Sequence, residues 1–317
     1  MIESVYKLTL SGLNSKRILV KLAAKVALKF VQRLSIIYDP LVNYSLNSCD
    51  IKIPLSHALP VILNQYPFYS SNLARVASCV KYKYDDLSII DIGANIGDSV
   101  FILRKEVFCP ILCIEGDEKF FKILQANTIK QENISIKKVF IGNTDEIIEQ
   151  ELVIVAGTAH FEESNTKTTE FKKLSSVLIN EPTFSKSKML KIDTDGFDLS
   201  IIRGSVDFIQ IVKPVLFFEY DPFFLSKQSD DGISIFSLLQ SLGYSHMCVY
   251  DNFGDYLISL PLQQSRQIED IHRYLLGRNG KFYYDICVVH EDDLDIAERL
   301  RAGETVFSEQ KIMNFAS

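Results

Sequence analysis

The stretch from Ser88 to Asp98 reads SIIDIGANIGD, and it decides the fold. It begins with a short apolar run rich in β-branched residues, which is typical of a buried strand. Two glycines, Gly93 and Gly97, then break the run, and after them apolar residues recur at helical spacing. Glycine adopts backbone conformations that a Cβ disfavours, so this pair permits a tight turn and the close approach of a ligand. Strand, glycine turn and helix in this order predict the first unit of a nucleotide-binding α/β fold.

The residues between and after the glycines limit the ligand. A dinucleotide-binding turn needs glycine at positions 93, 95 and 98, but Asn95 and Asp98 stand at the last two. A phosphate-binding loop ends in Gly-Lys-Ser/Thr, which does not follow here. Acids at a helix start repel a pyrophosphate, whereas Asp91 and Asp98 suit a cation, and the free amides of the helix's first turn suit a carboxylate. S-adenosylmethionine (SAM) satisfies these conditions, because it lacks phosphate and carries a positive charge.

Three motifs, in this order, resemble those of one protein family. They are DIGANIGD at 91–98, LKIDTDGFD at 190–198 with Arg203-Gly204, and PVLFFE at 214–219. The first resembles the opening motif of class I SAM-dependent methyltransferases, and the other two narrow the resemblance to the FkbM type. The resemblance implies the fold of that class. This fold is an α/β, Rossmann-like three-layer sandwich with a mostly parallel, seven-stranded sheet.

The resemblance also implies a set of cofactor-binding residues. Glu115 ends the second expected strand, where class I methyltransferases bind the ribose hydroxyls, and a carboxylate can accept two O–H donors at once. Asn143 follows the third expected strand, beside the usual place of adenine. Alternatively, Glu115 is a solvated acid at a strand end, and Asn143 belongs to an ordinary Gly-Asn turn. The full cofactor-binding set is Asp91, Gly93, Ala94, Asn95, Gly97, Asp98, Glu115, Gly116 and Asn143.

Two further acids are the candidate catalytic residues. Asp193 and Glu219 end the fourth and fifth expected strands at the same sheet edge, where one of them could take the proton of a hydroxyl acceptor or orient it. They could instead cap the following turns or hold a divalent cation, although nothing in the sequence fixes a metal. Lys191 is interpreted as a paired or snorkelling lysine, and His160 as a surface residue rather than a base. The family usually has Glu at the position of Asp195, so a contact made there reaches less far.

Composition narrows the class of protein. The 317 residues are 47% hydrophobic and 23% charged, which is ordinary for a globular chain. The net charge of −6 argues against nucleic acid as a partner. The six cysteines form no C-x-x-C pair and no zinc-ligand spacing, and charges interrupt every long apolar stretch. We therefore expect reduced thiols, no signal peptide, no membrane span and a cytoplasmic location.

The chain divides into three parts. Residues 1–80 form a helical and hairpin extension, 81–290 the methyltransferase domain, and 291–317 a C-terminal helix and tail. No acid occurs from Ser4 to Tyr38, and residues 16–37 predict a helix with apolar residues between regularly spaced cations. Those cations are Arg17, Lys21, Lys25, Lys29 and Arg33. This helix could bind an anionic membrane surface or an acidic partner. Alternatively, it packs on the catalytic domain with its lysines in water.

Together these features predict a SAM-dependent methyltransferase that O-methylates a hydroxyl of a glycan or another small molecule, such as a secondary metabolite. An NAD-linked oxidoreductase or epimerase is disfavoured by Asn95 and Asp98. A non-catalytic binding protein on the same fold stays open, as does the oligomeric state.

Overall fold

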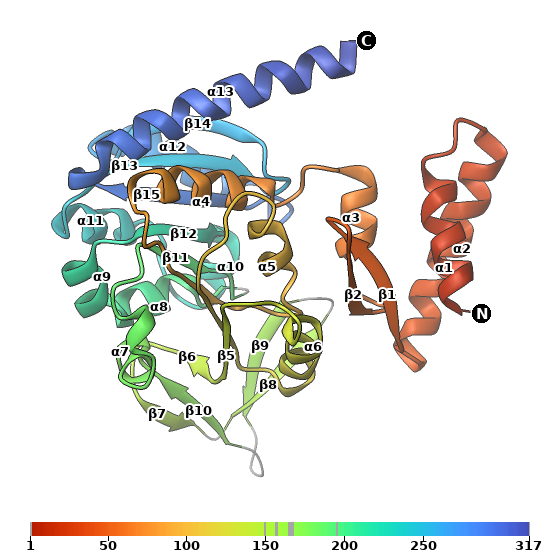
Figure 1. Ribbon diagram of the computed structural model, residues 1–317, viewed down its shortest axis with the longest axis horizontal. Coiled ribbons are helices and arrows are strands. Elements are labelled where there is room, and N and C mark those ends of the chain that lie inside the picture. The colour runs from red at the N-terminus through yellow and green to blue at the C-terminus, as the bar shows by residue number, and fades with distance from the viewer. Residues whose placement is uncertain (1, 149, 156–157, 164–167, 195, 317) are drawn as a thin grey trace.

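The computed structural model describes residues 2–148, 150–155, 158–163, 168–194 and 196–316 (Figure 1). Its helices are α1 Ile2–Leu13, α2 Ile18–Ile37, α3 Leu59–Gln65, α4 Ser71–Lys83, α5 Asp98–Leu103, α6 Glu118–Thr128, α7 Leu174–Leu178, α8 Asp198–Gly204, α9 Val206–Val212, α10 Pro222–Lys227, α11 Ser234–Ser241, α12 Ser265–Leu276 and α13 Leu294–Ala316. Its strands are β1 Leu41–Leu46, β2 Cys49–Pro54, β3 Ile89–Ile92, β4 Ile111–Glu115, β5 Ile134–Lys138, β6 Phe140–Ile141, β7 Glu146–Ile148, β8 Gln150–Val155, β9 Thr158–Glu163, β10 Thr169–Lys172, β11 Met189–Ile192, β12 Val215–Tyr220, β13 Tyr244–Asp251, β14 Tyr256–Pro261 and β15 Tyr284–His290.

The central sheet has the strand order β14-β13-β15-β12-β11-β3-β4-β5. The five strands from β12 to β5 run parallel, and β15 pairs antiparallel with both β12 and β13. The sheet therefore has eight strands rather than the expected seven, because β14 folds back onto β13 as an antiparallel hairpin. The expected class, a mostly parallel α/β fold, is confirmed.

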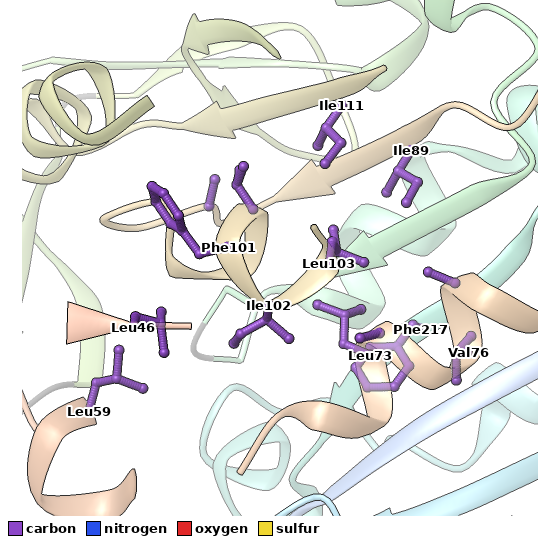
Figure 2. Close-up of a cluster of buried hydrophobic side chains, with 14 of the residues drawn as sticks. Leu46, Leu59, Leu73, Val76, Ile89, Phe101, Ile102, Leu103, Ile111 and Phe217 are labelled. Atoms are coloured by element: carbon purple, nitrogen blue, oxygen red, sulfur yellow. The ribbon is translucent and has the colours of Figure 1, made fainter. Parts of the chain in front are cut away.

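Helices cover both faces of this sheet and make the three layers (Figure 1). Alternate residues of a strand point to opposite faces, so Ile89 packs in one core cluster and Ile90 in the other. The first cluster contains apolar residues of α4, α5 and α13, and Figure 2 shows Leu73 of α4 and Leu103 of α5 in it, beside Phe217 of β12. The second contains residues of α8, α9 and α11. Burial on both faces explains why the parallel strands read as continuous apolar runs.

The N-terminal extension consists of the α1–α2 helix pair, the β1–β2 hairpin and α3. The hairpin side chain Leu46 belongs to the same core cluster as Phe101 and Ile102 of α5, so the extension packs near the helix that follows the glycine turn (Figure 2). Among the helices of the described residues, none combines the length and apolar character needed to cross a bilayer.

Candidate active site

The glycine turn packs directly on the end of β11. Gly93 and Gly97 both have a positive φ, of 76° and 84°. A Cβ on Gly93 would lie 1.8 Å from the backbone carbonyl oxygen of Asp193, so no other residue fits there without movement of the chain. The amides of Gly93 and Ala94 donate to the carbonyl of Ile114, at 2.9 and 3.0 Å. These two amides of the turn are therefore bonded to β4 and are not available to a ligand.

A pocket opens where β3, β4 and β11 end. It holds about 670 Å³ of empty space, part of it open to solvent. Gly93, Glu115 and Asp193 all line it, together with Asn95 and Gly116. The carboxyl ends of neighbouring parallel strands meet at one sheet edge, which is where ligands bind in open α/β sheets. Four residues of the predicted cofactor set therefore lie around one pocket.

Glu115 is held firmly at the floor of this pocket. Its carboxylate accepts the backbone N–H of Asn95 at 2.8 Å through Oε2, and that of Asp117 at 2.8 Å through Oε1. Burial raises the pKa of Glu115 to about 7, although the two amide hydrogen bonds oppose the rise. The side chain is thus preorganised to accept further hydrogen bonds from a ligand.

One wall of the pocket is aromatic and apolar. A Cβ on Gly116 would lie 2.1 Å from the ring of Phe140, so the absence of a side chain there leaves room for that ring. Phe140 and Phe171 come from β6 and β10, and their ring centroids are 5.8 Å apart. Val139 and Ile201 extend the wall. This wall suits a flat, mostly apolar ring, and the nearby carboxylate of Glu115 suits hydroxyl groups. Adenosine carries both a ring of this kind and hydroxyl groups.

Asp91 does not line the pocket, contrary to the role that the sequence suggested for it. It alternates with Ile90 and Ile92, so its side chain points into the core, where it is fully buried. The sheet register places it beside Lys191 on β11, whose Nζ lies 2.8 Å from Asp91 Oδ1. Ser99 donates to the other carboxylate oxygen. Asp91 is therefore a structural partner of the β3–β11 pair.

Lys191 has a larger part than the sequence suggested. Its Nζ also lies 3.4 Å from Asp193 Oδ2 and donates to the carbonyl of Gly93 at 3.3 Å. Burial lowers the pKa of Lys191, but Asp91 and Asp193 outweigh burial and the net pKa is raised, so the lysine stays charged. One buried cation thereby joins the glycine turn to the ends of β3 and β11.

Four other predicted cofactor residues lie outside this pocket's lining: Ala94, Gly97, Asp98 and Asn143. Asp98 is enclosed beside His57 of the extension. Burial raises the pKa of Asp98, and His57 opposes the rise. Gly97 packs on α6, where a Cβ would lie 2.8 Å from the side chain of Leu124. Asp195 lies outside the described residues, and His160 lies in β9, with its side chain outside the described set.

The Arg203-Gly204 motif has a packing reason. A Cβ on Gly204 would lie 2.4 Å from the Cα of Asn143, so the glycine allows α8 to approach the loop after β6. Arg203 forms a bidentate ion pair with Asp230 before α11. The motif therefore fixes the helices beside the pocket and places Asn143 as a contact of α8.

A second pocket adjoins the first. It holds about 460 Å³ of empty space, and it shares Asp193 with the first pocket. Its polar lining includes Glu219 and Asp285, which the register places opposite each other on β12 and β15. Burial raises the pKa of Asp285 to about 7. Both candidate catalytic acids of the sequence, Asp193 and Glu219, thus face this second pocket.

The second pocket contains acceptor atoms that the protein itself does not satisfy. Asn72 donates through Nδ2 to Asp285 at 3.0 Å, while its Oδ1 is buried and has no hydrogen-bond partner among the described residues. The same holds for Oδ1 of Asn252. Asn72 Oδ1 lies against Gly254, where a Cβ would come within 3.0 Å of it, so these buried atoms are enclosed by the protein itself. The acceptor groups that line the pocket are the carboxylates of Asp193, Glu219 and Asp285. Within the described ranges, no group of three or more His, Cys, Asp or Glu side chains is arranged to hold a metal ion.

Sequence reasoning missed Asp285 and Asn252. Asp285 is an isolated acid in the apolar run YDICVVH, and this pattern is the signal that could have found it. Asn252 lies in the β13–β14 turn, where asparagine is common, so no such signal existed.

Comparison with known proteins adds the family. The model of the methyltransferase FkbM domain matches residues 91–245. A search of curated proteins found no match. Among solved structures, the FkbM methyltransferase from Methylobacillus flagellatus KT is similar at 15% identity and a TM-score of 0.36, over 70% of this chain and 56% of that one. The present chain thus spans a little over half the length of that relative.

Two other similar structures are also methyltransferases. The METTL16 MTase domain matches at 12% identity and a TM-score of 0.42, over 83% of this chain and 80% of that one. The precorrin-6y C5,15-methyltransferase from Geobacter metallireducens GS-15 matches at 11% identity and a TM-score of 0.36, over 68% and 87%. With its motifs and the match over residues 91–245, this part of the chain is a methyltransferase FkbM domain.

Proposed function

We propose that the protein is a SAM-dependent O-methyltransferase that acts on a hydroxyl group of a glycan or of a polyhydroxylated secondary metabolite. The observation that carries this proposal is the pair of adjoining pockets that meet at Asp193. One has the lining of an adenosine site, and the other is rich in hydrogen-bond acceptors. A group-transfer enzyme needs such adjoining sites, because donor and acceptor must be held together for the reaction.

The first pocket fits SAM better than a dinucleotide. Glu115, Asp117 and Asp193 contribute carboxylates, and the lining of described residues includes no Lys or Arg. A pyrophosphate would meet only negative charge there, whereas SAM carries no phosphate and a positive sulfur. Glu115 would hold the ribose hydroxyls and the wall with Phe140 would hold the adenine. When bound, SAM would supply a methyl group on a positively charged sulfur, and the neutral thioether left after transfer is a good leaving group.

The second pocket supports a hydroxyl acceptor. A hydroxyl must lose its proton as it gains the methyl group, and a carboxylate within reach can take that proton. Asp193, Glu219 and Asp285 are the candidates. Asp285 suits this task at neutral pH, because its raised pKa of about 7 lets the group both accept and release a proton.

The same pocket supports a substrate with several hydroxyl groups. The carboxylates of Asp193 and Glu219 accept hydrogen bonds, and Asp285 accepts them when it is ionised. Sugars and polyols present many O–H donors. We therefore propose a glycan as the first choice of acceptor class, with polyhydroxylated secondary metabolites as the second.

Isothermal titration with SAM and with NAD tests the cofactor. We expect SAM to bind and NAD not to bind. NAD binding without SAM binding would instead support an oxidoreductase or epimerase, and no SAM binding by well-folded protein would defeat the proposal.

Transfer of a radiolabelled methyl group from SAM to a panel of sugars and polyols tests the reaction. We expect alkali-stable, ether-linked label on a hydroxylated acceptor. The double variant Asp193→Asn with Glu219→Gln should lose turnover and keep measurable but weaker SAM binding, because Asp193 also lines the first pocket. Unchanged turnover in this variant would show that neither acid is catalytic, and SAM binding without any transfer would support a non-catalytic binding protein.

We also propose a cytoplasmic location. All six cysteines are free, and four of them are buried, which suits a reducing compartment.

A further inference from the structure

Helix α2 exposes a continuous apolar stripe to solvent. Leu19, Val26, Phe30 and Ile37 follow one another at spacings of seven, four and seven residues, so they lie on one face of the helix. Their exposed fractions are 81, 69, 66 and 87%. Isolated exposed apolar residues are common, but a row of four large ones along a whole helix indicates a binding surface.

The opposite face of α2 is the one that packs on the protein. Ala24 and Val31 are buried, and a Cβ on Gly12 of α1 would lie 2.8 Å from the Cβ of Ala24. This close crossing fixes the orientation of α2 in the helix pair. Figure 1 shows the pair at the edge of the molecule, with β1, β2 and α3 between it and the central sheet. The apolar stripe therefore points outward and does not pack on the catalytic domain.

A row of cations borders this stripe. Lys21, Lys25, Lys29 and Arg33 recur every fourth residue, and at 100° per residue they lie between the apolar stripe and the face that contacts α1. In the part of the chain that the structure describes, no carboxylate forms an ion pair with any of them. No acid lies between Ser4 and Tyr38, so the charged residues of α2 are all cations.

We propose that α2 docks the enzyme on an anionic lipid surface, where it lies in the plane of the interface. Lipid headgroups supply the negative charge that its cations lack, and the acyl boundary beneath them accepts the apolar stripe. A second copy of the chain fits less well, because two such helices would bring their rows of cations together. This inference concerns where the enzyme works and is independent of the methyl acceptor.

Vesicle flotation with the full chain tests the proposal. Vesicles would contain phosphatidylcholine alone, or phosphatidylcholine with about a third phosphatidylglycerol. We expect flotation with the anionic vesicles and loss of it at high salt. Because each basic residue near such a surface strengthens partitioning about fivefold, the triple variant Lys21→Gln, Lys25→Gln, Lys29→Gln should bind about a hundredfold more weakly. The double variant Val26→Glu, Phe30→Glu should lose binding altogether.

The matched control is Ile211→Glu in α9, a residue that is also 81% exposed but lies outside α2. It should float like the parent. All variants should bind SAM with the parent's affinity, so that a loss of vesicle binding can be distinguished from a loss of the proposed methyl transfer. Absence of the parent protein from anionic vesicles would overturn the proposal. A second result would also overturn it. If the parent were a dimer that stayed off vesicles, and the Val26→Glu, Phe30→Glu variant were a monomer, a second copy of the chain would cover the stripe.

Discussion

Replacing Glu115 by Gln should remove a loss of stability that the parent protein suffers as pH rises and, at the same time, weaken SAM binding. The side chain is only 9% exposed, and burial raises its pKa from the ordinary value of 4.5 to about 7. Ionising it in the folded protein therefore costs about 3 kcal/mol relative to ionising it in the unfolded chain. Gln is neutral at every pH and avoids this cost, but its Nε2 cannot accept the backbone N–H that one carboxylate oxygen accepts, which costs about 1–3 kcal/mol at every pH.

The effect has a definite pH dependence. Between pH 4.5 and about 7 the folded protein binds more protons at Glu115 than the unfolded chain, so the parent loses stability as pH rises through this window. The stability of Glu115→Gln relative to the parent should thus rise by up to about 3 kcal/mol from pH 4 to pH 8. Urea unfolding at both pH values measures it.

SAM binding should change in the opposite direction. The amide loses one charge-assisted acceptor, and such hydrogen bonds contribute about 1.5–3 kcal/mol, so we expect an affinity roughly 10- to 150-fold lower by titration calorimetry at pH 8. For the parent, affinity should fall as pH drops below 7, because protonated Glu115 is a poorer acceptor. The exposed Glu106, changed to Gln, is the control and should alter neither quantity.

Two results would refute this reasoning. A stability difference between Glu115→Gln and the parent that is the same at pH 4 and pH 8 would mean that the carboxylate is not desolvated as the structure indicates. Unchanged SAM affinity would mean that Glu115 does not contact the cofactor.

Three further changes test other parts of the site. Lys191→Met should lower the free energy of unfolding by about 3–5 kcal/mol, because it leaves Asp91 charged and unpaired in the core; the double variant with Asp91→Leu should regain part of this loss in urea unfolding, and a loss below about 1 kcal/mol would contradict the buried pair. Gly93→Ala should sharply lower the melting temperature, because a Cβ there would meet the carbonyl oxygen of Asp193. Gly303→Ala in α13, where a Cβ meets no atom within 4 Å, should instead stabilise the helix by about 1 kcal/mol. Asp285→Asn should keep SAM binding but remove the rise of kcat that we expect near pH 7, and a retained rise would exclude Asp285 as the base.

Much of the fold followed from local sequence patterns. The apolar runs gave β3, β4, β11 and β12 to within a residue or two, and the two glycines marked the turn after β3. Because parallel strands end at one sheet edge, the sequence also led to Gly93, Glu115 and Asp193 as neighbours, and all three line one pocket. These features depend on periodicity and connectivity alone.

Contacts between distant segments could not be read from the sequence. Asp91 looked like a ligand for a cation, but only the register of β3 on β11 shows that the cation is Lys191, a hundred positions along the chain. Asn72 meets Asp285 across 213 positions, so the acceptor pocket exists only after β15 inserts between β12 and β13. The physical reason is the same in both cases. A strand's own residues determine that it is buried, whereas which polar group it meets there is decided by the pairing and packing of segments far apart in the chain.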